Sequence, residues 1–119
     1  MGDLTKDLSR YEFACKCGKC DFDIVDYELA MTLQEIRDYW EKPVVITSGC
    51  RCPEHNNSIG GSKKSKHMSG TAADFYVPGI SPAKMYDWLD HRYYTKFGIG
   101  NGKSFSHLDI RKHKARWAY

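Results

Sequence analysis

The stretch that decides the fold is SKHMSGTAADF, residues 65–75. It places His67 seven residues before Asp74, and small residues fill much of the space between them. The β-prone run Phe75-Tyr76-Val77 follows, so we expect Asp74 on a strand of residues 71–77 and His67 on the loop before it. Small residues let the chain fold back closely, so the two side chains can converge on one metal ion. The alternative is a solvent-exposed loop histidine followed by an aspartate in a turn or at a strand end.

A second polar pattern lies in the β-prone segment of residues 104–111. Alternate residues of a strand share a face, so His107, Asp109 and Arg111 are expected on one side, with the intervening leucine and isoleucine directed into the core. The alternative is an edge strand with a solvated face. Arg51 adds a cation directly after a short buried-strand pattern, where a fixed guanidinium suits a carboxylate or a developing oxyanion.

Helical patterns occur at two places. Apolar residues recur at helical spacing over residues 26–41, where Asp26 can cap the start, and a second helix is expected from Ser81-Pro82 to about His91. Strands and helices do not alternate regularly, so we predict one α+β domain over residues 1–119 with a small antiparallel sheet flanked by helices. Residues 1–25 form a cysteine-containing arm packed on it.

Charge and hydrophobicity argue against two functional classes, nucleic-acid-binding proteins and membrane-spanning proteins. The net charge is +3, and the basic clusters at residues 63–66 and 111–116 indicate solvated faces. The alternative is a surface that attracts a polyanion, either nucleic acid or an anionic cell wall. No helix-turn-helix, zinc-finger or RNA-binding pattern is present, and no apolar run reaches the roughly 20 residues that span a bilayer. We therefore expect a monomer that neither binds nucleic acid nor inserts into a membrane. The first residues lack the apolar segment of a signal peptide, which predicts synthesis in the cytoplasm without one.

The segments TSGCRCPEHNNSIGG, SKHMSGTAADF, FSHLDIR and ARW together resemble the zinc D-Ala-D-Ala carboxypeptidase family of murein peptidases. Small phage and bacterial peptidoglycan peptidases are the most similar members. The resemblance implies a fold shared with the hedgehog signalling domain, and one catalytic Zn²⁺ held by His67, Asp74 and His107. It also implies that Arg51 binds substrate or stabilises the tetrahedral intermediate, and that Ser65 lies beside the substrate.

The implied activity is hydrolysis of an amide bond in peptidoglycan stem peptides, by a D-Ala-D-Ala carboxypeptidase or a murein endopeptidase. The corresponding setting is a phage endolysin or a virion-associated enzyme that acts on the cell wall. A non-catalytic, zinc-containing wall-binding module of the same fold is the alternative, as in the hedgehog case.

Two departures from the family pattern stand out. Many members place an acidic general base three residues before the last histidine ligand, where this chain has Ser104. Asp109 is then either the base or a group that orients a ligand, and His113 is a remote third candidate for the base. Cys50 stands where an aromatic residue is usual.

The cysteines form two clusters, and three interpretations of them stay open. They hold a structural zinc ion, they form one or two disulfides between the arm and the Arg51 loop, or they are free thiols. A cysteine nucleophile is not expected, because the histidines are better explained as ligands. The residues concerned are Cys15, Cys17, Cys20, Cys50 and Cys52.

Overall fold

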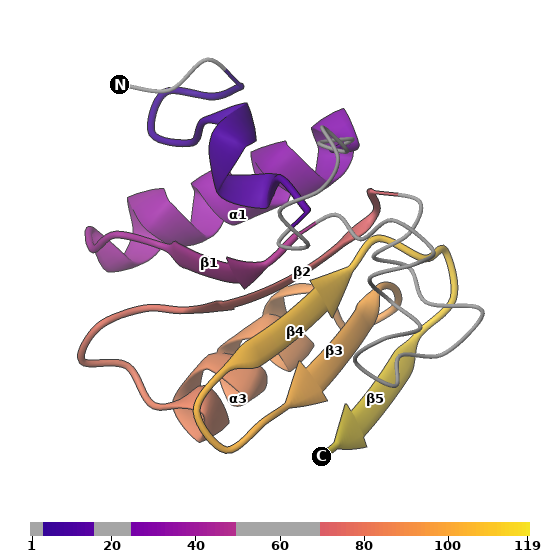
Figure 1. The fold of residues 1–119 in the computed structure, drawn as a ribbon. Coiled ribbons are helices and arrows are strands. Elements are labelled where there is room, and N and C mark those ends of the chain that lie inside the picture. The colour runs from indigo at the N-terminus through magenta and orange to yellow at the C-terminus, as the bar shows by residue number, and fades with distance from the viewer. Residues whose placement is uncertain (1–3, 16–24, 50–69) are drawn as a thin grey trace.

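The structure is a computed structural model that describes residues 4–15, 25–49 and 70–119 (Figure 1). The α+β class expected from the sequence is confirmed. In chain order, the described residues form η1 (Arg10–Phe13), α1 (Tyr27–Trp40), β1 (Val45–Ser48), β2 (Ala72–Tyr76), α3 (Pro82–Arg92), β3 (Gly98–Asn101), β4 (Ser106–Asp109) and β5 (Ala115–Ala118).

The five strands form one sheet in the order β1-β2-β4-β3-β5. The sheet is mixed, so the prediction of an antiparallel sheet is wrong for one pair: β3 and β5 are parallel, while the other neighbours are antiparallel. The chain leaves β4 and returns on the far side of β3, which makes β5 antiparallel to β4 and therefore parallel to β3. Strand β4 lies in the middle of the sheet, so the edge-strand alternative is also wrong.

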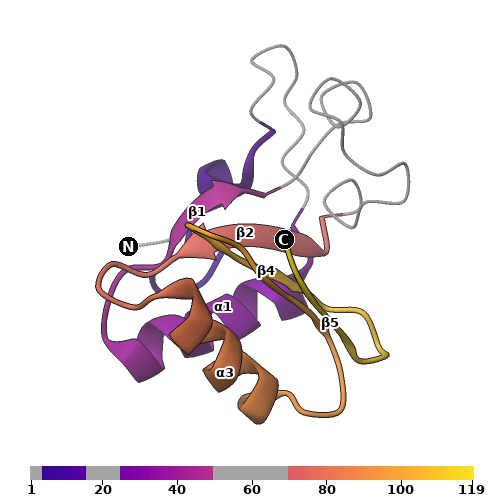
Figure 2. The same cartoon turned by 90° about the horizontal axis from the view of Figure 1, so that it is seen from below.

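Both α-helices pack on one face of the sheet (Figure 2). The core between these layers joins Leu33 and Ile36 of α1 and Leu89 of α3 to Phe75 and Leu108 of the sheet, and all five are fully buried. Apolar burial of this kind is the main favourable term in folding. The helices thereby leave the opposite face of the sheet to polar side chains of β2 and β4.

The helix boundaries follow local signals in the sequence. The Asp26 side chain accepts a hydrogen bond from the Glu28 amide at 2.8 Å, and α1 ends at Glu41 in a left-handed conformation, with φ of 53°. The Ser81 hydroxyl accepts from the Lys84 amide at 3.2 Å at the start of α3. Both predicted helices are confirmed. Within the described residues, neither is long and apolar enough to cross a membrane.

The described part of the N-terminal segment contacts the domain directly. Leu8 and Phe13 are each 1% exposed and belong to the core cluster, and Cys15 is buried. Phe13 also approaches β1 so closely that a Cβ at Gly49 would lie 2.6 Å from its backbone. The glycine that follows β1 is therefore required by this contact.

Candidate functional site

A polar cluster lies on the face of the sheet opposite to α1 and α3. Asp74 of β2 is directly opposite His107 in the β2–β4 register, and Asp109 follows two residues later on β4. Leu108, between them, points into the core. The alternation predicted for His107, Leu108 and Asp109 is therefore confirmed, and the pairing of β2 with β4 adds Asp74 to the same face. Arg111, predicted on the same strand, lies two residues past the end of β4.

Asp109 is the most deeply buried member of the cluster, with 0% exposure. Its Oδ1 accepts from Nε of Arg111 at 2.7 Å, and its Oδ2 accepts from Nη2 of Arg111 at 2.8 Å. His107 Nε2 lies 2.9 Å from the same Oδ2. A buried carboxylate needs such partners, because an unpaired charge in the interior is very costly.

Neighbouring groups in this cluster shift the pKa values of Asp109 and His107 toward their charged forms. Burial alone would raise the pKa of the Asp109 carboxyl, but hydrogen bonds from His107 and Arg111 hold that pKa well below its usual range. Burial lowers the pKa of His107, yet the hydrogen bonds with Asp109 and Asp74 outweigh it and the pKa is raised. Asp109 is thus ionised at neutral pH and only accepts hydrogen bonds.

The protonation of the His107 ring follows from these partners. Since the ionised Asp109 is an acceptor, Nε2 of His107 carries the proton and donates to it. Nδ1 then faces a second carboxylate oxygen, Oδ1 of Asp74, at 2.8 Å. Two acceptors do not meet at this distance, so either a proton lies between Nδ1 and the Asp74 carboxyl or a cation bridges them.

Residues of β3 and β5 surround the polar cluster. A Cβ at Gly98 would lie 2.6 Å from Oδ1 of Asp109, and one at Gly100 would lie 2.7 Å from Nε1 of Trp117. These two glycines therefore leave room for the cluster.

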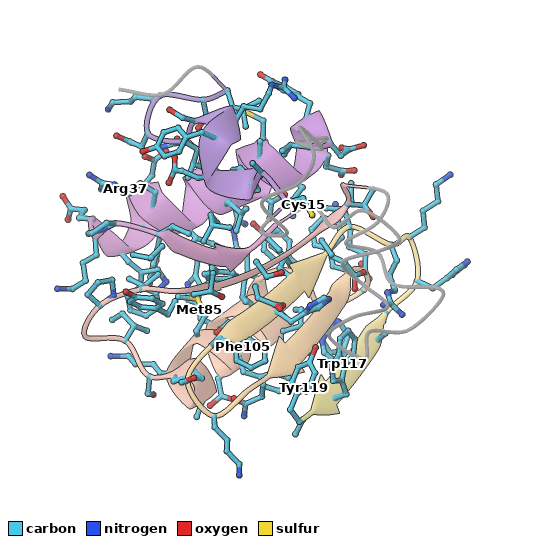
Figure 3. All side chains as sticks on the ribbon, viewed as in Figure 1. Cys15, Arg37, Met85, Phe105, Trp117 and Tyr119 are labelled. Carbon is cyan, nitrogen blue, oxygen red and sulfur yellow. The ribbon has the colours of Figure 1, made fainter. Side chains whose placement is uncertain are left out.

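The Trp117 ring lies 5.0 Å from the His107 ring, and the Arg111 guanidinium lies 5.3 Å from the Trp117 ring, within cation–π range. Figure 3 shows Trp117 beside Tyr119 and Phe105 at this end of the sheet.

The structure brings Asp74, His107 and Asp109 together. The other residues proposed for the site lie outside the described residues: Arg51, Ser65, His67, Cys17, Cys20, Cys50 and Cys52. Ser104 is exposed in the turn before β4, and His113 is exposed before β5. The sequence patterns missed β5 and Trp117, because residues 111–116 were interpreted as a solvated basic face. Strand β5 has four residues, which is too short for an alternation of apolar and polar residues to be recognised in the sequence.

The donor set fits a metal ion in part. Asp74 and His107 offer one oxygen and one nitrogen, both ligand types that Zn²⁺ accepts, and His107 donates its other ring N–H to a carboxylate as metal-bound histidines typically do. Asp74 and Asp109 approach different ring nitrogens. Within residues 4–15, 25–49 and 70–119, no group of three His, Cys, Asp or Glu side chains is arranged to hold a metal.

Comparison with known proteins adds one match. Residues 6–109 match a family model described as Peptidase M15. The matched span includes β2 and β4 with Asp74 and His107, and it ends before β5. No curated protein matches the chain.

Proposed function

The chain belongs to the M15 peptidase family of zinc D-Ala-D-Ala carboxypeptidase-like hydrolases, and from this membership we propose that it hydrolyses an amide bond in peptidoglycan stem peptides. Peptidases of this family are zinc-dependent in general. The specific activity that we propose is that of a D-Ala-D-Ala carboxypeptidase or a murein endopeptidase.

The observation that carries this proposal is the position of His107 between two carboxylates. Asp109 accepts the Nε2 proton of His107, so Nδ1, which faces Asp74, is the ring nitrogen that would bind a metal ion. Asp74 and His107 are then two ligands of a zinc ion, and His67, outside the described residues, is the third. Zinc bound there would supply a Lewis acid that activates a water molecule and polarises the amide carbonyl.

We assign Asp109 to positioning rather than to the general base. Its side chain is fully buried and both of its oxygens are occupied by Arg111 and His107. A base must reach the proton that it removes, within hydrogen-bond distance or through one water. Arg51 remains our candidate for stabilising the oxyanion, and Ser65 for a hydrogen bond to the substrate.

The biological setting that we propose is breakdown of the bacterial cell wall by a phage, from an endolysin or a virion. The support is the resemblance of the SKHMSGTAADF and FSHLDIR segments to small phage and bacterial peptidases. The terminal D-Ala-D-Ala bond, the L-Ala-D-Glu bond and the cross-link between stems are the candidate bonds.

A non-catalytic zinc module that binds the cell wall is the second candidate. The observation that favours it is Ser104, which lies exposed in the turn where many family members carry the acidic base. A serine hydroxyl cannot take a proton at neutral pH as a carboxylate does.

Digestion of purified muropeptides separates the two functions. The zinc-loaded protein is incubated with monomeric and cross-linked muropeptides, and the products are identified by mass spectrometry. We expect loss of one stem-peptide bond, arrest by a chelator and recovery on adding zinc. An unchanged muropeptide profile with retained wall binding would establish the module instead.

Two variants control this experiment. His107→Ala is expected to lose both zinc and activity, because it removes a ligand. His91→Ala changes an exposed histidine of α3 and should keep both. A His107→Ala protein that still bound stoichiometric zinc at this site and cleaved muropeptides would contradict the ligand assignment.

A further inference from the structure

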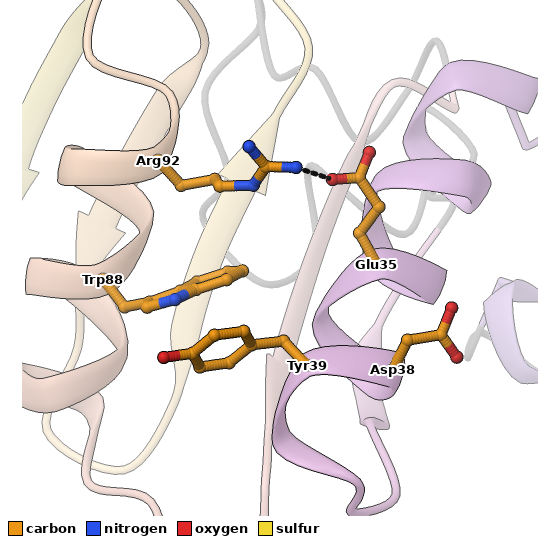
Figure 4. Close-up of a pocket in the computed structure, with 5 residues that line it drawn as sticks. All are labelled: Glu35, Asp38, Tyr39, Trp88 and Arg92. Carbon is orange, nitrogen blue, oxygen red and sulfur yellow. Dashed lines mark hydrogen bonds and ion pairs between the residues drawn. The ribbon is translucent and has the colours of Figure 1, made fainter.

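A groove runs between the two α-helices (Figure 4). Both helices lie on the face of the sheet opposite to the polar cluster (Figure 2), so the groove lies away from that cluster. Its volume is about 440 Å³, within the range of small-molecule clefts of about 300–1,000 Å³. Helix α1 contributes Glu35, Asp38 and Tyr39, and α3 contributes Trp88 and Arg92. None of these residues takes part in the zinc chemistry proposed above.

Aromatic rings form the floor of the groove. The Tyr39 and Trp88 rings reach toward one another from the two helices, with centroids 4.7 Å apart and an interplanar angle of 36°. Trp40 meets both rings edge-on, at 5.0 Å from Tyr39 and 5.9 Å from Trp88. Contacts from two directions hold the indole ring of Trp88 in place, so it offers a preorganised flat surface.

Two carboxylates and a guanidinium line the rim. Oε2 of Glu35 accepts from Nη2 of Arg92 and from the Tyr93 hydroxyl, both at 3.0 Å. Oδ1 of Asp38 accepts from Nε2 of Gln34 at 3.0 Å. Within the described part of the chain, the second oxygen of each carboxylate has no hydrogen-bond partner. The rim therefore offers two acceptors, and donors from the remaining guanidinium N–H groups.

The mixture of charges selects the chemical class of ligand. Glu35 and Asp38 repel a polyanion, and an organic cation would have to displace Arg92 from Glu35, with which it is already paired. A purely apolar ligand would strip water from the two carboxylates without replacing its hydrogen bonds. An uncharged sugar fits, because its ring has an apolar C–H face for Trp88 and hydroxyl groups for the carboxylates and the guanidinium.

We propose that this groove binds the glycan strand of peptidoglycan through its uncharged N-acetylhexosamine units. The choice of this glycan rests on the proposed function, which brings the protein to the cell wall. The groove and the His107 cluster lie on opposite sides of the molecule, so the bound strand differs from the one whose stem peptide is cleaved. The groove thus tethers the protein to the multistranded wall and contributes nothing to cleavage of a soluble muropeptide.

Binding is tested with a tetramer of N-acetylglucosamine as the probe, by isothermal calorimetry on the full chain. Tyr39→Ser and Trp88→Leu are expected to weaken binding about tenfold or more, since each removes part of the aromatic floor. Tyr39 is 60% exposed, so its replacement leaves the core intact. The matched control is Tyr27→Ser, which changes a tyrosine of α1 that is 67% exposed and lies outside the groove. Absence of tetramer binding, or equal binding by Tyr39→Ser and wild type, would overturn the proposal.

Two further measurements complete the design. Tyr39→Ser should retain wild-type cleavage of soluble muropeptides and lose cleavage of intact sacculi, whereas an equal effect on both substrates would overturn the tether. Binding to an anionic wall polymer, with none to the tetramer, would assign the groove to a different ligand class and overturn it as well. The tetramer is also titrated into His107→Ala, which is expected to lack activity but to have an unchanged groove. Its tetramer affinity should equal that of the wild type. Failure of the proposed hydrolysis and failure of glycan binding are thereby observed separately.

Discussion

At the scale of single residues, the candidate site depends on how one imidazole is held. His107 is 6% exposed and lies between Asp74 and Asp109, one carboxylate at each ring nitrogen. Arg111 balances the charge of Asp109 through two hydrogen bonds, and this pairing makes burial of the carboxylate tolerable. Asp109 and Arg111 together thus hold the His107 ring in one orientation.

Replacement of Asp109 by asparagine tests that role. Asp109→Asn keeps the shape but removes the ionised acceptor, so we expect zinc affinity to fall about 10- to 100-fold, as for other groups that orient a metal ligand. Zinc affinity is measured by competition with a chromophoric chelator, and turnover is measured at saturating zinc. Asp87→Asn, on the exposed side of α3, is the matched control. Loss of turnover with unchanged zinc affinity would instead identify Asp109 as the general base.

At the scale of elements, β5 is attached to the end of α3 by one side chain. Arg116 donates from Nε to Asp90 at 2.6 Å, and from its terminal nitrogens to the carbonyl oxygens of Phe97 and Tyr93, each at 2.7 Å. The cation lies beside the C-terminal end of α3, where the helix dipole favours positive charge. Its hydrogen bonds add to those that the backbone amides of Lys96 and Ala115 donate to the same two carbonyls. Two cations of the basic segment at residues 111–116, Arg111 and Arg116, are therefore structural.

Removal of this guanidinium should destabilise the fold. Arg116→Met keeps the aliphatic stem but removes the charged hydrogen bonds to Asp90 and to the Phe97 and Tyr93 carbonyls. We expect a loss of about 1–3 kcal/mol in the free energy of unfolding. Urea unfolding followed by circular dichroism measures it. Lys114→Met is the control, because Lys114 is 4.0 Å from the same Asp90 and its side chain is 42% exposed, so its loss should cost less than about 1 kcal/mol. Equal effects of the two variants would show that Arg116 contributes only as a surface charge.

At the scale of the whole molecule, the hydrophobic core and the candidate site lie on opposite faces of the sheet. The core lies between the sheet and the two helices, whereas Asp74, His107 and Asp109 lie on the other face. The core is closed by apolar side chains of the described residues and includes none of the proposed metal ligands. A metal at His107 is therefore expected to add to a fold that already forms.

Chelation of zinc tests this separation. Dialysis against a chelator should abolish muropeptide cleavage while the far-ultraviolet circular dichroism spectrum stays native, because the core is independent of the site. The midpoint of thermal unfolding should fall, since a ligand present at 100 times its dissociation constant stabilises the native state by about 2.7 kcal/mol. Complete unfolding of the chelated protein at room temperature would show that the metal is required for the fold.

The candidate ligands Asp74 and His107 came from the resemblance of the sequence to zinc murein peptidases. The sequence by itself determined the two helices and the strand patterns around residues 71–77 and 104–111. These features depend on caps and on periodicities within a few residues, which are written locally in the chain. Only the tertiary structure decided the register that sets Asp74 opposite His107, the full burial of Asp109, and the parallel pairing of β5 with β3. Each of these depends on contacts between residues far apart in the chain, and no local pattern encodes which strands become neighbours.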